Sequence, residues 1–276
     1  MPDKRTAWLI VRESLRDFRW YEWAPFGWIL AAQLLFLLCA VNLGTSWGML
    51  VAGSVTMAAA GGETFLRYPQ FFLALPTIAA LVEWILYVVA GAVLIPLAIL
   101  RISEPAEPRG PRDTQARLLR AILPVLAGGI VNLLVLQAWQ WAMEKGPAPF
   151  LLGYFPGGLG RLVVWLLGVV VSYLISAPFL LIPVNAVQRG STFGGALVGG
   201  FREGLRMIVP AFLVVLLFSW PSLIFLGPVQ IMPQVIVNKL RPELVALLLA
   251  LYATVMAFAN YLIYAAVTRL HWARQA

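Results

Sequence analysis

Six long runs of apolar residues alternate with shorter polar stretches along the chain. They lie near residues 25–43, 75–100, 121–143, 162–188, 207–227 and 244–268. A helix that crosses a bilayer needs about 20 predominantly apolar residues, so each run is close to this length or beyond it. The second and fourth runs exceed it, and we expect them to tilt or to kink at Pro76, Pro96, Pro178 or Pro183. The pattern predicts an all-α, polytopic membrane protein with six transmembrane helices.

The segment before the first run, residues 1–24, has a different pattern. Apolar side chains recur at helical spacing, and the basic ones fall on the other side: Trp8, Val11, Leu15 and Phe18 against Arg12, Arg16 and Arg19. Tryptophan and tyrosine follow just before Pro25. A basic, tryptophan-rich amphipathic helix is typical of the headgroup plane of a membrane. We predict an interfacial helix here, and a solvated cytoplasmic helix is the alternative.

Two loops between the runs are longer than a simple connection requires. Residues 44–72 are half apolar and predict a helix on the outer surface. Residues 219–243 contain four prolines and two short apolar stretches, which predict an interfacial or re-entrant segment.

Composition supports the membrane assignment. Of the 276 residues 61% are hydrophobic and 12% charged, and the mean hydropathy is +0.86. A soluble domain carries about 25% charged residues, so soluble, disordered and disulfide-scaffold classes are all excluded. The single cysteine, Cys39, cannot form a disulfide within one chain and lies in the first apolar run, where it is expected to be a small hydrophobe.

The net charge of +8 would suggest nucleic acid as a partner in a soluble protein, but here its distribution indicates topology. With the N-terminus inside, the inner segments 1–24, 101–120, 189–206 and 269–276 hold 15 of the 20 Lys and Arg residues. Cytoplasmic loops carry such an excess. We therefore predict both termini in the cytoplasm of a bacterium, the protein in its inner membrane, and no nucleic-acid partner.

Similar short sequences recur at both ends of the predicted helix pairs. RESLR, ARLLR and REGLR occur at 12–16, 116–120 and 202–206, and LIPLAILR, LIPVNAVQR and LIYAAVTR close the even helices. The repeat predicts one membrane domain, 1–276, in which the interfacial helix 1–24 precedes three hairpins, 25–100, 101–188 and 189–276.

The repeated motifs place arginines at the inner side. Arg16, Arg120 and Arg206 are expected at helix starts, where a cation is unfavourable for the helix dipole by a few tenths of a kcal/mol. Anionic lipid headgroups or an acidic partner would offset this cost. The residues expected to bind lipid or partner are Arg12, Arg16, Arg120, Arg202 and Arg206. Simple positive-inside topology without specific binding is the alternative.

The stretch ISAPFLLIPVNAVQRGSTFGGALVGGFREGLRMIVPAFLVVLL, residues 175–217, carries a resemblance. It resembles bacterial six-helix membrane proteins similar to the membrane domain of glycerophosphoryl diester phosphodiesterases, with relatives of unknown function. The shared features are a proline-containing helix end, a loop, an amphipathic helix with arginine and a further membrane helix. The soluble catalytic barrel of that family has no counterpart in these residues, so the resemblance implies a fold and no activity.

Candidate chemistry is sparse. His271 is the only histidine and is expected at the inner membrane edge, which argues against a histidine metal site or a catalytic relay. We predict no cofactor, no metal and no enzymatic activity. Glu83 is the only acid within the six runs. An interfacial position is favoured for it, and a buried proton- or ligand-linked carboxylate is the alternative. Asn132 and Asn185 are the weaker candidates for ligand binding, and most polar residues in the spans should connect helices by hydrogen bonds.

These observations favour a non-catalytic integral membrane subunit or scaffold of a bacterial inner-membrane complex, with lipids and other protein subunits as partners. The alternative is the permease subunit of an ABC-type exporter or another transporter, because six spans with both termini inside fit that class. An intramembrane enzyme is the least favoured class for want of candidate residues.

Overall fold

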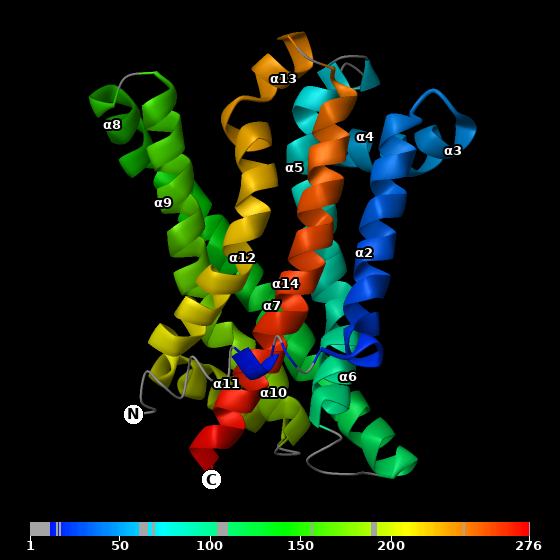
Figure 1. Ribbon diagram of the computed structural model, residues 1–276, viewed down its shortest axis with the longest axis vertical. Coiled ribbons are helices and arrows are strands. Elements are labelled where there is room, and N and C mark those ends of the chain that lie inside the picture. The colour runs from blue at the N-terminus through cyan, green and yellow to red at the C-terminus, as the bar shows by residue number, and fades with distance from the viewer. Residues whose placement is uncertain are drawn as a thin grey trace. The chain divides into compact units, whose positions relative to one another are not determined.

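The described residues of the computed structural model are helical throughout, without strands (Figure 1). They are residues 12–14, 16, 18–60, 66–67, 70–103, 110–155, 157–188, 192–239 and 241–275. Six helical segments among them are long and apolar enough to cross a membrane: Trp20–Val41, Gln70–Val89, Arg112–Lys145, Gly158–Gln188, Ile208–Ile231 and Glu243–Trp272. The predicted all-α class is confirmed, and six helices have the length and apolar composition expected of spans, whereas the hairpin arrangement and the interfacial helix stay predictions.

The first span begins earlier than its apolar run. Helix α2 extends over Trp20–Val41 and has Glu22 in its first turn. Trp20, Tyr21 and Trp23 therefore belong to the span and not to a separate interfacial helix. Of the predicted helix 1–24, residues 12–14 and 16 are helical, and residues 1–11 lie outside the described part.

The two longest runs are each divided into shorter helices. The second run consists of α5 (Gln70–Val89) and α6 (Gly91–Ser103), which separate at Ala90. The fourth run consists of α9 (Gly158–Ser176), the 3₁₀ turn η3 (Ala177–Leu180) and α10 (Leu181–Gln188). Pro178 lies in η3, so the expected proline-linked irregularity occurs at this position, because proline removes one helical hydrogen bond.

Both long loops contain helices. Residues 46–60 form α3 (Ser46–Gly48), the π-helical turn η1 (Met49–Gly53) and α4 (Ser54–Ala60). The region 219–243 differs from the expected re-entrant segment. Helix α12 (Ile208–Ile231) continues through Pro221 and Pro228, and the short α13 (Pro233–Lys239) follows it.

The remaining helices are α7 (Pro111–Lys145), α8 (Pro147–Tyr154), α11 (Phe193–Arg206) and α14 (Glu243–Gln275). The chain divides into two compact units. Unit 1 consists of residues 1–27, 87–219 and 258–276, and unit 2 consists of residues 28–86 and 220–257. Each of α2, α5, α12 and α14 contributes residues to both units.

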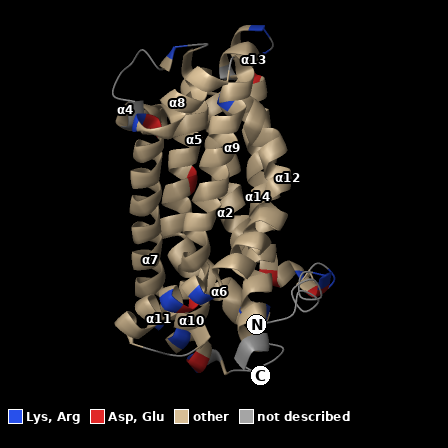
Figure 2. Cartoon of the chain, turned by 90° about the vertical axis from the view of Figure 1, so that its left-hand side faces the viewer, with Lys and Arg blue, Asp and Glu red and all other residues tan. Residues whose placement is uncertain are grey.

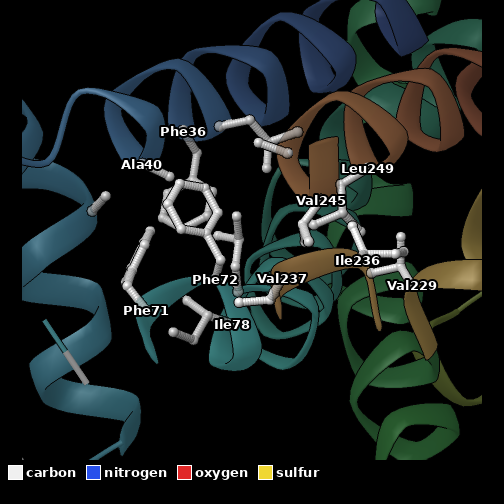
Figure 3. Close-up of a cluster of buried hydrophobic side chains, with 14 residues drawn as sticks. Phe36, Ala40, Phe71, Phe72, Ile78, Val229, Ile236, Val237, Val245 and Leu249 are labelled. Atoms are coloured by element: carbon white, nitrogen blue, oxygen red, sulfur yellow. The ribbon is translucent and has the colours of Figure 1, made fainter. Parts of the chain in front are cut away.

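Unit 2 is built around a cluster of buried aliphatic and aromatic side chains (Figure 3). It combines residues from α2, η1, α5, α12, α13 and α14, among them Phe36, Phe71, Phe72, Ile236, Val245 and Leu249. Side chains from four segments that are distant in sequence thus pack together, and this packing fixes the position of α5 against α14.

Unit 1 is held together by close packing around α10 and α11. Helix α11 contacts η3, α10 and α7, and its buried residues are Ala196, Gly200 and Gly204. A Cβ atom on Gly204 would lie 2.0 Å from the carbonyl oxygen of Pro178, and one on Gly200 would lie 2.7 Å from Cα of Ile182. Small residues four positions apart therefore let α11 approach the backbone of the preceding segment.

Candidate functional site

Three side-chain contacts bring distant helix ends together in unit 1. Arg117 of α7 donates from Nη1 to the carbonyl oxygens of Val187 and Gln188, at 3.5 and 3.2 Å. Nδ1 of His271 lies 3.0 Å from Oε1 of Glu203. The start of α7, the end of α10, helix α11 and the end of α14 thus share one end of unit 1.

A fourth contact adds the N-terminal segment, since Arg269 of α14 donates to Oγ of Ser14 at 3.3 Å. We call this the basic end of unit 1, defined by Arg12, Arg16, Arg120, Arg202 and Arg206 on these segments. All five residues are exposed. Figure 2 shows charged residues at both ends of α7 and around α10 and α11, and a long uncharged stretch of α7 between them.

Exposed apolar side chains lie beside the exposed arginines. On α7, Leu119 and Leu123 next to Arg120 are 62% and 59% exposed. On α11, Val198 is 66% exposed, and Leu205, beside Arg206, is 48% exposed. Arginine beside exposed apolar side chains is typical of a membrane interface, because its stem lies along apolar surface while the guanidinium reaches the headgroups.

Two of the expected helix-start positions are wrong. Helix α7 begins at Pro111, so Arg120 lies in its third turn, and Arg206 lies in the last turn of α11. The sequence pattern located the start of the apolar run at residue 121. The helix begins ten residues earlier, because the polar residues 111–120 belong to α7 as well. A cation in a last turn is favourable for the helix dipole, so the expected dipole cost does not apply at Arg206.

Other arginines of unit 1 bind backbone carbonyl groups instead. Arg101 donates from Nη1 to the carbonyl oxygen of Tyr21 at 2.6 Å. In a helix this oxygen would accept from the N–H of residue 25, but Pro25 has none. Arg101 therefore supplies the hydrogen bond that the proline removes. Arg117 similarly binds the last carbonyl groups of α10, where a positive charge is favourable. For the contact between Arg101 and Tyr21, the sequence shows Pro25 and therefore a missing helical hydrogen bond. It does not show that Arg101 is the residue that replaces the bond.

A buried carboxylate at the start of α2 was missed in the sequence. Glu22 is 4% exposed and accepts a hydrogen bond at 2.8 Å from the hydroxyl of Tyr261, which is 1% exposed. Nε of Arg19 lies 3.9 Å from its other oxygen. The apolar run was placed from residue 25 onward, so Glu22 counted as part of a solvent-facing segment.

His271 also differs from its expected place. It is completely buried and pairs with Glu203 of α11, whereas an interfacial side chain was expected. The pair joins the end of α14 to α11. Among the residues that the structure describes, no group of three or more His, Cys, Asp and Glu side chains is arranged to hold a metal ion.

The candidate ligand-binding residues are divided between the two units. Asn132 of α7 accepts a hydrogen bond from Oγ of Ser176 at 3.3 Å, so it connects two helices as expected of polar residues in spans. Asn185 is 1% exposed, and its Nδ2 lies against Gly199 of α11, 2.9 Å from where a Cβ would be. Both belong to unit 1. Glu83 belongs to unit 2, where it accepts a hydrogen bond from the hydroxyl of Tyr252.

No family model matches the chain, and no curated protein and no solved structure is similar to it. The stretch 175–217 folds as η3, α10, α11 and the first part of α12. Its resemblance to the membrane domain of glycerophosphoryl diester phosphodiesterases stays a prediction.

Proposed function

We propose that this protein is a non-catalytic integral membrane subunit or scaffold of a bacterial inner-membrane complex. In this proposal the basic end of unit 1 faces the cytoplasm, and its exposed arginines bind the phosphate groups of anionic lipids or an acidic surface of a partner subunit. Both chain termini lie on the same cytoplasmic side.

The observation that carries the proposal is the division of arginines in unit 1. Arg101, Arg117 and Arg269 donate hydrogen bonds to backbone or side-chain oxygens of the protein itself. The five arginines of the basic end are exposed, and exposed apolar side chains lie beside Arg120, Arg202 and Arg206. Three arginines are therefore bound to acceptors of the protein itself, and the basic end presents a further set of guanidinium groups that suits phosphate or carboxylate ligands.

The charge distribution supports the orientation. The segments predicted to be cytoplasmic hold 15 of the 20 Lys and Arg residues. Anionic lipids in the cytoplasmic leaflet attract each Lys or Arg near the surface by about 1 kcal/mol. Three arginines would then contribute about 3 kcal/mol, which corresponds to roughly a hundredfold in affinity.

The test compares two triple variants with the same loss of charge. Arg16, Arg120 and Arg206 are replaced together by Gln, and the control replaces Arg67, Arg161 and Arg241, which lie in the predicted outer segments. Both variants keep more basic residues inside than outside, so the topology should hold. Bound lipids and subunits are identified by mass spectrometry after purification in mild detergent.

We expect the first variant to lose bound anionic lipid or a partner subunit, and the control to keep both. Unchanged lipids and partners in the first variant would leave only positive-inside topology as the role of these arginines. Copurification of the wild-type protein with an ATPase would instead support the alternative function, a permease subunit of an exporter.

A further inference from the structure

Within the described part of unit 2, Glu83 has a polar contact with Tyr252. The hydroxyl of Tyr252 on α14 donates a hydrogen bond to Oε1 of Glu83 on α5, at 3.3 Å. Glu83 is partly buried, and it lies inside the candidate span Gln70–Val89. The packing of α5 against α14 in the core cluster of unit 2 places these two side chains together.

The exposed face of α5 is apolar on both sides of Glu83. Leu73, Leu81, Ile85 and Val89 are 38%, 37%, 51% and 61% exposed, and they are spaced by whole helical turns. An interface at the level of Glu83 would leave Leu73 and Leu81 facing water or headgroups. These side chains indicate that hydrocarbon surrounds α5 both before and after Glu83.

Distances along the helix agree with this position. At a rise of 1.5 Å per residue, Glu83 lies about 20 Å from Gln70 along α5. The hydrocarbon core of a bilayer is about 30 Å thick. Moving Glu83 to the outer interface would place the apolar first half of α5 outside the core.

The described part of unit 2 supplies no positive charge to this carboxylate. Its titratable or charged residues besides Glu83 are Cys39, Arg67, Lys239, Arg241, Glu243 and Tyr252. Arg67 lies before α5, Lys239 in α13 and Arg241 between α13 and α14. All three are outside the candidate spans. Tyr252 is the hydrogen-bond donor to Glu83. Cys39 of α2 packs against the core cluster. Glu243 lies about 14 Å from Tyr252 along α14.

The next side-chain contact on this face of α14 is neutral. Met256 lies one turn after Tyr252, and Oγ of Ser222 on α12 is 3.6 Å from its Sδ atom. A charged carboxylate within hydrocarbon requires a positive partner, since isolated ions there are very costly. Neither Tyr252 nor the Ser222–Met256 contact provides one.

We propose that Glu83 is a proton-binding carboxyl site within the membrane, with Tyr252 as the residue that positions it. The proton is the positive partner that the described part of unit 2 lacks. This site is independent of the basic end of unit 1, and neither proposal depends on the other.

Carbodiimide labelling tests the site directly on the purified full-length protein in liposomes. A protonated carboxyl adds its O–H across one C=N bond of the reagent: the oxygen bonds to the central carbon and the proton moves to a nitrogen. The acyl group then transfers from oxygen to the second nitrogen and gives a stable N-acylurea. No atom leaves, so peptide mass spectrometry detects a gain equal to the whole reagent.

Glu243 provides a matched control because it is exposed, at the start of α14, and in the same unit. We expect membrane-soluble dicyclohexylcarbodiimide to modify Glu83 at least tenfold more than Glu243. A water-soluble carbodiimide should show the opposite preference. The Glu83→Gln variant should lose the adduct and keep the labelling of Glu243.

Equal reactivity of Glu83 and Glu243 with the water-soluble reagent would overturn the proposal and place Glu83 at the interface. Replacing Na⁺ and K⁺ in the buffer by choline should leave the labelling of Glu83 unchanged. Protection by Na⁺ or K⁺ would instead identify a metal-cation site and would overturn the assignment to a proton.

Discussion

Two acids of unit 1, the buried Glu22 and the partly buried Glu203, have a partner from the last helix. Glu22 accepts a hydrogen bond from Tyr261, and Glu203 pairs with His271, although the partners are far apart in the sequence. A buried polar group without a partner costs about 1–3 kcal/mol. These pairs therefore fix where the N-terminal helix and α11 meet α14.

The Glu22–Tyr261 pair gives the first prediction. Replacing Tyr261 by Phe removes the donor and leaves the carboxylate of Glu22 buried. The free energy of unfolding should fall by about 1–3 kcal/mol, measured as a lower midpoint in detergent. Tyr154→Phe is the matched control, because Tyr154 in the same unit is 72% exposed and should show no change. Equal stability of Tyr261→Phe and the control would show that the hydrogen bond contributes nothing.

The contact between Arg101 and Tyr21 gives a second prediction, through its dependence on Pro25. In the wild type, Arg101→Gln leaves the carbonyl oxygen of Tyr21 without its donor and should destabilise the protein by about 1–3 kcal/mol. In a Pro25→Ala background the N–H of residue 25 can bind that oxygen, so the same change should cost less. A double-mutant cycle of unfolding free energies measures the difference. Additive effects would mean that Arg101 does not compensate for the proline.

At this scale the sequence predicted residue types better than partners. It marked Arg101 and Arg269 as basic residues at the predicted inner end, but not that they bind Tyr21 and Ser14. Partners of this kind follow from helix packing, which leaves no local pattern. The hydrogen bond between Asn132 and Ser176 agrees with the expectation that most polar residues in the spans connect helices, because a polar amide in an apolar span needs a partner.

Helix α11 combines a buried face of small residues, a polar contact to α14 and exposed arginines. Its small residues Ala196, Gly200 and Gly204 are buried, Glu203 reaches His271, and Arg202 and Arg206 are exposed. The resemblance carried by residues 175–217 implied an amphipathic helix with arginine in this region. The packed partner of its small-residue face was not predictable, since η3 and α10 were expected to be part of one continuous span.

The packing of α11 leads to a third prediction. In Gly204→Ala the new methyl group would lie 2.0 Å from the carbonyl oxygen of Pro178, which is backbone and cannot rotate away. We expect a loss of stability of about 3 kcal/mol or more, or failure to accumulate. Gly194→Ala on the same helix meets no atom within 4 Å and should change stability by less than about 1 kcal/mol. Similar expression and unfolding midpoints for the two variants would show that α11 does not pack closely on this segment.

The boundaries of the elements followed the apolar pattern only in part. All six spans were predicted, since about 20 consecutive apolar residues have few alternatives to a membrane helix. The pattern failed where polar residues extend a helix, as in the first turns of α7, and where an apolar run holds an internal break, as at Ala90.

At the scale of the whole molecule, the two units distribute polar residues differently. Unit 1 carries the basic end and the internal arginine contacts, whereas unit 2 has an apolar core and the carboxylate of Glu83 in the middle of an apolar helix. The sequence predicted three hairpins from short repeats, and this division stays a prediction. Orientation rests on the charge count, which is a property of the sequence alone.

The most direct test of the account is the accessibility of single cysteines in intact bacterial cells. Native Cys39 is replaced by Ala, and one cysteine is introduced at Gly153, Asp113 or Gln275. Gly153 lies in α8, beyond the far end of α7 from Asp113, and has open space around it. A membrane-impermeant maleimide should label position 153 in intact cells, and positions 113 and 275 only after the membrane is permeabilised. Labelling of position 275 in intact cells would contradict both the six-span topology and the cytoplasmic basic end.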